Sequence, residues 1–435
     1  MKKGKLKRVS ITEFVVAMGL VGGLLVIPQG VRAADGGGWV GDRFVVRDEV
    51  EREVHPSVAY NSKWNEYLVV LFNDRPGNDD IRAERFDSNG RSLGGKWVAA
   101  GPGAERRYPD VTYNRDRNEY LVVWEEEIPA TSQSLIKARR LAADATPIGT
   151  EVPVFTGITG VLMPRNPAVA YAHTSQTFLV VWEYEVNVGP PPSVTHIESE
   201  VLDALGAPFH TIDISLDPGG APRQSPDVAY NRHANRFLVV WQQWDPGASL
   251  WDVWSRLVDG DGPPPDWSPV RLAYYSVHST APAVAAIPTS PTAEKYLVVW
   301  EHHHPTTGRD IYGIMVDEGG MPHAGDIKIT MSSADETSPA VAGSESGQRY
   351  LVVWRKQQGV IDVPIAGQAL ASTGYEVGLE DTIGAPAANY PAVASGPVGG
   401  FLATYQDQAP WATHSGVWGH KWGNQAYLPL VVRNR

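Results

Sequence analysis

Cysteine is absent from this chain of 435 residues. Its absence excludes a disulfide framework, thiolate chemistry and any metal site held by cysteine. Two common catalytic motifs are also missing, because the sequence has neither a Gly-x-Ser-x-Gly nucleophile turn nor a phosphate-binding glycine loop. We therefore expect a fold stabilised by a buried core, with no cofactor and no metal.

Basic residues are the minority, with 37 Lys and Arg against 49 Asp and Glu. Residues 1–33 hold six basic side chains and one acidic one, so the rest of the chain carries a formal charge of about −17. Nucleic acids and anionic lipid surfaces attract basic proteins. The charge therefore argues against both as the main partner.

Long hydrophobic runs are rare, and the clearest one lies near the N-terminus. A basic start is followed by an apolar run from Phe14 to Ile27 and by the small-residue end Val31-Arg32-Ala33. This order predicts a secretory signal over 1–33. The alternative is an uncleaved membrane anchor, but the run is shorter than the roughly 20 residues of a spanning helix. We expect a protein that is secreted or held at the cell surface, with no membrane span after signal removal.

The rest of the chain is a repeat. Seven times a proline is followed by a short strand, a turn and an apolar run such as Tyr-Leu-Val-Val-Trp; the prolines are Pro56, Pro109, Pro167, Pro226, Pro282, Pro339 and Pro391. Their spacings are 53, 58, 59, 56, 57 and 52 residues. Periods of this length are typical of propellers and solenoids.

Each repeat is strand-like throughout. In the first repeat the expected strands are 58–60, 67–72, 81–86 and 96–99, separated by Gly, Pro and Asn clusters. The second strand is apolar at consecutive positions, as in Tyr120 to Trp124, which indicates burial on both faces. Each proline fits the first residue of a strand, since it lacks an N–H. These features predict an all-β, seven-bladed β-propeller of four-stranded antiparallel blades.

The ends of the chain predict how the ring closes. The last repeat has room for three strands, over 392–394, 401–405 and 416–422, while the unassigned strand Arg43–Arg47 precedes the first repeat. We expect this N-terminal strand to join the last blade and supply its outer strand. The propeller then spans 34–422, and 423–435 form a C-terminal tail.

The repeats YPDVTYNRDRNEYLVVW (108–124) and SPDVAYNRHANRFLVVW (225–241) resemble the PAVAYNxxxNxYLVVW repeats of exported bacterial proteins. The resemblance covers residues 55 to about 422. That family is mostly described only as repeat or β-propeller proteins, so the resemblance implies a fold but carries no catalytic residues.

The two ends of the expected sheets differ. One end, here called the turn face, carries near-identical turns such as NSKWNE and NRDRNE together with four Asp-x-x-Gly turns. We interpret the latter as hairpin turns, and a calcium loop at Asp259–Gly262 is the alternative. The other end, here called the loop face, carries loops that differ in length and composition. Variable loops on a rigid frame usually carry binding function, so we expect the ligand on the loop face.

Three sets of side chains on the loop face are candidates for the site. In three repeats the residue directly after the repeat's tryptophan is a carboxylate, at Glu125, Glu183 and Glu301. These carboxylates either act as acid and base on a glycoside or are solvated strand ends. The adjacent His302, His303 and His304 offer imidazoles, but neighbours on a strand point to opposite faces, which disfavours a zinc or copper site. The tryptophans Trp244, Trp251 and Trp411 could stack on sugar rings or pack between blades.

The sequence thus predicts a monomeric binding or interaction module whose ligand is an extracellular glycan or protein. The expected ligand-binding residues are Glu125, Glu183, Trp244, Trp251, Glu301, His302, His303, His304 and Trp411. The alternative function is an extracellular glycoside hydrolase or polysaccharide lyase in which Glu125, Glu183 and Glu301 act at the mouth of the propeller.

Overall fold

The computed structural model describes residues 38–47, 52–74, 78–186, 194–215, 220–262, 267–290, 293–306, 308–323, 325–344, 346–357, 364–383, 388–407 and 416–423. Contacts divide the chain into residues 1–33 and 34–435, and every described residue belongs to the second unit. The expected signal, Trp411 and the expected tail beyond Gly423 lie outside the described residues. No helix in the described ranges is long and apolar enough to cross a membrane.

The described chain is all-β apart from two short 3₁₀ turns at Pro129–Thr131 and Pro397–Gly399. The first two repeats form β2 (Arg52–Asn61), β3 (Glu66–Asp74), β4 (Asp80–Asp87) and β5 (Ser92–Ala99), then β6 (Glu105–Asn114), β7 (Glu119–Ile128), β8 (Gln133–Ala142) and β9 (Pro147–Ile158). The third and fourth form β10 (Leu162–Ala172), β11 (Thr177–Val186), β12 (Val194–Leu202) and β13 (Pro208–Asp213), then β14 (Arg223–Asn231), β15 (Arg236–Asp245), β16 (Leu250–Asp259) and β17 (Val270–Arg271).

The remaining repeats continue the pattern. They form β18 (Ser279–Ser290), β19 (Ala293–His304), β20 (Gly308–Val316) and β21 (Ile327–Lys328), then β22 (Asp335–Ser344), β23 (Arg349–Gln357), β24 (Ile365–Ala371) and β25 (Glu376–Ile383), and finally β26 (Asn389–Ser395), β27 (Phe401–Asp407) and β28 (Gly416–Gly423). All pairings between consecutive strands are antiparallel, and the second and third repeats are joined into one eight-stranded sheet through the single pair Leu162 and Ile158.

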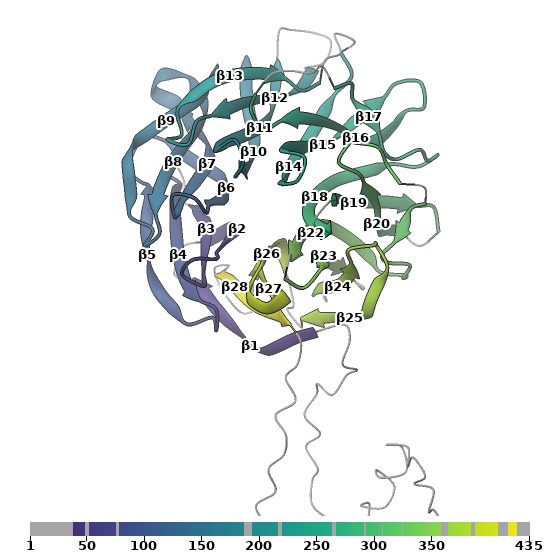
Figure 1. Cartoon of the computed structure of the whole chain (residues 1–435). Coiled ribbons are helices and arrows are strands. Elements are labelled where there is room, and N and C mark those ends of the chain that lie inside the picture. The colour runs from purple at the N-terminus through teal and green to yellow at the C-terminus, as the bar shows by residue number, and fades with distance from the viewer. Residues whose placement is uncertain are drawn as a thin grey trace, which may run out of the picture. The chain divides into compact units, whose positions relative to one another are not determined.

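The N-terminal strand β1 (Gly38–Arg47) belongs to the sheet of the last repeat. It pairs antiparallel with β28, with Trp39 opposite Trp422 and Phe44 opposite Gly419, so this sheet has the order β1-β28-β27-β26. Figure 1 shows β1 beside β28, with the first strand of every repeat turned toward the centre. The sheet of the last repeat therefore combines strands from the two ends of the described chain.

The core lies between successive sheets. Tryptophans of the second strands are fully buried; they are Trp124, Trp182, Trp241, Trp300 and Trp354. Each apolar cluster is shared by two successive repeats, and one of them joins Leu71 and Val69 of the first repeat to Leu402 and Val417 of the last. Burial on both faces explains why these strands are apolar at consecutive positions.

The repeat prolines occupy a different place from the one expected. They lie inside the first strand of each repeat, as Pro56 does in β2, rather than at its start. The pairing register shifts there, between Val54 and Ser57 in the first repeat, which marks a β-bulge. The residue before each proline has a positive φ, between 49° at His55 and 55° at Ser225. A bulge leaves one residue out of the ladder, so a proline without an N–H is tolerated in the strand interior.

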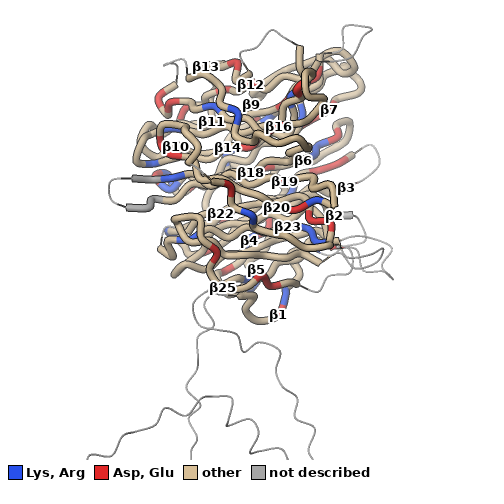
Figure 2. Tube along the Cα trace, turned by 90° about the vertical axis from the view of Figure 1, so that its right-hand side faces the viewer, with Lys and Arg blue, Asp and Glu red and all other residues tan. Residues whose placement is uncertain are grey.

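Charged residues of both signs are distributed over all the sheets. Figure 2 shows Lys and Arg positions interspersed with Asp and Glu positions along the strands. Many are paired across strands, as Arg85 is with Glu66 at 2.5 Å and Arg140 with Glu119 at 3.0 Å. Basic and acidic residues are thus interspersed, and the described strands carry no continuous stripe of basic residues (Figure 2).

Candidate functional site

The three predicted carboxylates have a shared structural partner. Each accepts a hydrogen bond from the backbone N–H of the residue that precedes the next repeat's proline, and so does Gln242. The bonds are Asn166 N to Glu125 Oε2 at 3.4 Å, Ser225 N to Glu183 Oε2 at 2.6 Å, Ala281 N to Gln242 Oε1 at 2.8 Å and Ser338 N to Glu301 Oε1 at 2.8 Å. These N–H groups belong to the positive-φ residues of the bulges. The side chains therefore tie the second to fifth repeats each to the next repeat, by satisfying a backbone donor that the strand pairing leaves unpaired.

Desolvation dominates the electrostatics of these carboxyls. It raises the pKa of Glu125 to about 7, against the lowering effect of the Asn166 N–H and of Arg165 and Arg107. The pKa values of Glu183 and Glu301 are raised for the same reason. Glu125 has the longest backbone bond of the three. The Glu125 carboxyl is therefore held less tightly by a backbone N–H than the carboxyls of Glu183 and Glu301.

Two of the carboxylates lie together and the third has other neighbours. Asn166 contacts both members of the pair, since its backbone N–H reaches Glu125 and its Nδ2 donates to Glu183 at 3.0 Å. The negative charge of Glu183 contributes to the raised pKa of Glu125. Glu301 instead accepts a bond from Thr280 Oγ1 at 3.3 Å and lies 3.6 Å from Arg309 Nη1.

An aromatic cluster lies between the fourth and fifth repeats at the loop face. Trp244 and Trp251 face each other across the β15–β16 hairpin, with ring centroids 5.6 Å apart and planes at 68°. The ring of His278 stacks on that of Trp244, with ring centroids 6.2 Å apart, and its Nδ1 accepts a hydrogen bond from the backbone N–H of Trp251 at 3.1 Å. His303 follows, 5.5 Å from His278. Both tryptophans are half-buried, so part of each ring faces solvent.

The three adjacent histidines separate as the strand geometry requires. His303 lies on the side of Glu301 and its Nε2 is 3.0 Å from Thr280 Oγ1. His302 is buried on the other side, with its ring 4.2 Å from that of Tyr312 and 4.4 Å from that of Tyr275. Desolvation lowers the pKa of both. Among the described residues no three or more His, Asp or Glu side chains are grouped so as to hold a metal ion.

A second aromatic cluster was missed by the sequence analysis. His55, Tyr108 and Tyr390 are the residues before the prolines of the first, second and last repeats. Their ring centroids lie 4.5 Å apart for His55 and Tyr108 and 3.5 Å apart for His55 and Tyr390. Phe72, at the capping position of the first repeat, lies 5.9 Å from Tyr108. The sequence does show three aromatic residues at the position before the repeat proline. It predicts a cluster only if the first and last repeats are known to be neighbours.

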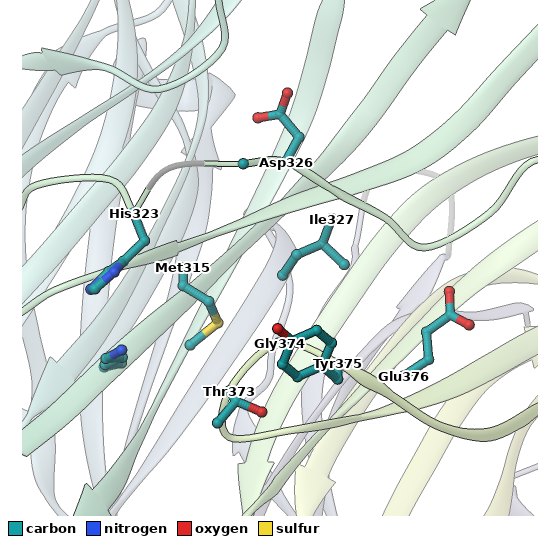
Figure 3. Close-up of a pocket in the computed structure, with 10 residues that line it drawn as sticks. Met315, His323, Asp326, Ile327, Thr373, Gly374, Tyr375 and Glu376 are labelled. Atoms are coloured by element: carbon teal, nitrogen blue, oxygen red, sulfur yellow. The ribbon is translucent and has the colours of Figure 1, made fainter.

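Three cavities in the described part of the chain lie away from all of these residues. One of about 630 Å³ opens between β20–β21 and the turn before β25, where Met315, Ile327 and Tyr375 lie between His323 on one side and Glu376 on the other, with Asp326 next to Ile327 (Figure 3). Smaller wedges of about 180 and 120 Å³ occupy corresponding positions beside Gly206 and Gly320. The three cavities recur at equivalent positions between neighbouring repeats on the turn-face side. None of them is lined by a predicted ligand-binding residue.

Comparison with family models and with curated proteins found no match. Solved structures do match. A protein of unknown function from Dyadobacter fermentans has 11% identity and a TM-score of 0.53, covering 92% of this chain and 100% of that one. An α-L-arabinanase of Penicillium chrysogenum, solved with arabinobiose, has 11% identity and a TM-score of 0.51, covering 82% and 99%. A structure described as the Dos1 propeller has 9% identity and a TM-score of 0.43, covering 90% and 96%.

At this level of identity the similarity concerns the fold alone. The described chain is all-β, and its sheets have the arrangement of a β-propeller. Fold does not give function, because propeller scaffolds carry unrelated sites. The function has to be argued from the side chains at the loop face.

Proposed function

We propose that residues 34–422 form a seven-bladed propeller whose ring is closed by β1 as the outer strand of the last blade. The support is the pairing of β1 with β28 and the apolar cluster shared by the first and last repeats. The first strands contact one another in the order β2, β6, β10, β14, β18, β22 and β26, and β26 contacts β2. A closed ring leaves only short, protected sheet edges, whereas long exposed edges invite aggregation.

We also propose that this propeller is a secreted module that binds carbohydrate at its loop face. The observation that carries the proposal is the cluster of Trp244, Trp251 and His278, with His303 next to it. Half-buried indole rings offer flat apolar faces beside polar groups, which suits the C–H face of a sugar ring. Glu301 and Arg309, which meet at 3.6 Å beside His303, add hydrogen-bonding groups.

Glycoside hydrolysis is a second candidate, favoured by one observation. A carboxyl with a pKa of about 7, as at Glu125, has the property of a general acid at neutral pH. The bonds that Glu183 and Glu301 make to backbone N–H groups weigh against this candidate, since they give both side chains a structural role. Binding without hydrolysis is therefore the function we favour.

The test is a glycan and polysaccharide array read for both binding and cleavage. We expect binding by the wild type and a loss in Trp244→Ala and Trp251→Ala. Trp64→Ala is the matched control, because Trp64 is 47% exposed in a turn of the opposite face. Binding that survives both loop-face substitutions and is lost in Trp64→Ala would place the site on the turn face.

The same array separates the second candidate. Release of new reducing ends by the wild type, abolished in Glu125→Gln while binding persists, would support hydrolysis. A protein partner in place of a glycan would leave every carbohydrate spot unbound.

A further inference from the structure

The residue before each repeat proline has one backbone conformation and several side chains. All seven have a positive φ, and in order they are His55, Tyr108, Asn166, Ser225, Ala281, Ser338 and Tyr390. Left-handed backbone favours glycine and asparagine over bulky residues. The bulge therefore does not explain why three of these positions carry large rings.

The three rings come from neighbouring strands and meet. β26, β2 and β6 contact one another in that order, and they bring Tyr390, His55 and Tyr108 within the ring distances given above. Tyr390 remains 39% exposed, and His55 and Tyr108 are partly buried. The result is an aromatic surface on one side of the inner rim. At the same position the other four repeats carry small or amide side chains, which are Asn166, Ser225, Ala281 and Ser338.

This surface is uncharged, although charges surround it. Desolvation lowers the pKa of His55 to about 3, so its ring is neutral at physiological pH. The nearby guanidinium of Arg107 is paired with Asp79 and Glu105, and Arg165 lies 3.6 Å from Glu185. Glu125 is paired with Arg107 across β6 and β7 and so lies next to Tyr108, whose pKa it helps to raise. Flat apolar faces beside one carboxyl suit an uncharged ring that carries hydroxyl groups.

Below the rim the inner strands are tied closely together. Ser57 Oγ donates to Asp110 at 2.6 Å, and Asp110 in turn accepts the Val169 N–H of the next repeat at 2.8 Å. Asp227 accepts the Val284 N–H at 2.8 Å. Asp110 and Asp227 belong to sheets two repeats apart, yet the charge of Asp110 raises the pKa of Asp227. The inner strands of successive repeats are therefore linked by side-chain bonds just below the rim.

We propose that His55, Tyr108 and Tyr390 form a stacking platform for one uncharged sugar ring of a glycan, with Glu125 hydrogen bonding to its hydroxyls. The proposal rests on the proposed function, since it assumes that the loop face binds carbohydrate. It adds a contact separate from the tryptophan cluster, and it requires an uncharged sugar ring in the ligand.

The experiment uses the full-length protein and single-ring probes. Methyl glycosides of glucose, galactose, mannose and arabinofuranose are titrated by ligand-observed NMR, alongside the oligosaccharide that binds best on the array. The variants are Tyr108→Asn and Tyr390→Asn, which introduce the residue that Asn166 already provides on the same backbone. We expect both to fold and to weaken a methyl glycoside by about two- to tenfold each. Tyr390→Phe keeps the ring and should retain binding.

Matched controls locate the effect. Ser338→Ala changes an equivalent rim position without a ring, and Tyr375→Ala removes a tyrosine that is 76% exposed elsewhere; neither should alter binding. Unchanged affinity in Tyr108→Asn and Tyr390→Asn overturns the platform, and so does a wild type that binds oligosaccharides but no methyl glycoside. In both cases a loss of oligosaccharide binding in Trp244→Ala would leave the proposed function standing. Absence of any glycan binding would overturn both.

Discussion

Substitution of Glu183 separates a structural role from a catalytic one. Its carboxylate accepts the backbone N–H of Ser225 at 2.6 Å and the side-chain amide of Asn166 at 3.0 Å. Glu183→Ala leaves the Ser225 N–H without this acceptor at a partly buried position, whereas Asn166 is exposed and water can replace the lost bond. An unsatisfied buried donor costs about 1–3 kcal/mol. We therefore expect Glu183→Ala to lower the free energy of unfolding by about that amount.

Glu183→Gln should behave differently because the protein already contains this arrangement. Gln242 occupies the corresponding position one repeat later and accepts the Ala281 N–H at 2.8 Å. The amide oxygen of a glutamine can thus make the bond without a charge, and it also avoids the desolvation that raises the pKa of Glu183. We expect Glu183→Gln to be as stable as the wild type or slightly more stable.

Thermal unfolding followed by circular dichroism measures both variants. Unfolding entropy of about 2.1 cal/mol/K per residue gives roughly 0.8 kcal/mol/K for a unit of this length, so Glu183→Ala should lower Tm by about 1–4 °C. Glycan binding should be retained in Glu183→Gln. An equal Tm in the two variants would refute the structural role of the bond to Ser225. Loss of glycoside hydrolysis in Glu183→Gln would instead support a catalytic role for Glu183.

Three further predictions concern the core, the ring and the pH dependence. Trp241 is fully buried, so Trp241→Ala should cost about 3–5 kcal/mol and lower Tm by roughly 4–6 °C; a shift below 1 °C would mean that the inter-sheet core is not cooperative. Deletion of 34–50 removes β1 and exposes β28, so the protein should aggregate or lose most of its stability, and a soluble variant with wild-type Tm would contradict the closure. The pKa of Glu125 is raised to about 7, so its contribution to stability is fully present below about pH 4.5 and falls as pH rises to about 7. Denaturant titrations across this range should show a decline of up to about 3 kcal/mol, which Glu125→Gln should abolish; the same slope in the variant would assign it to other groups.

The sequence predicted what a single repeat determines. Consecutive apolar residues such as those from Tyr120 to Trp124 require cover on both faces of a strand, and the tryptophans of this position are indeed fully buried. The Asp-x-x-Gly turns were also readable locally: Asp317 accepts the N–H groups of Gly319 and Met321, and Gly320 has a φ of 79°. Such features depend on neighbours within the same hairpin.

The features that were missed depend on contacts between repeats. Nothing within one repeat shows that Glu183 will cap the N–H of Ser225, because the two residues are 42 positions apart and lie in different sheets. The prolines were expected at strand starts, where the lost N–H costs nothing, but the bulge provides the same tolerance inside the strand. Of the predicted site, the structure brings Trp244 and Trp251 together and places Glu301 with His303, whereas Trp411 lies outside the described residues.

The capping rule itself indicates where the repeat departs from symmetry. At the position of Glu183 and Gln242 the first repeat carries Phe72, which cannot accept a hydrogen bond, and the residue opposite it in the next repeat is Tyr108. A ring contact of 5.9 Å between these two stands where the second to fifth repeats have a side-chain to backbone bond. Two substitutions at neighbouring positions thus exchange a polar link for an aromatic one, at the place where His55 and Tyr390 also meet. A ligand has no repeat symmetry, so a specific site needs such a departure from symmetry. Here a hydrogen bond that stabilises the fold is exchanged for an aromatic surface that solvent can reach.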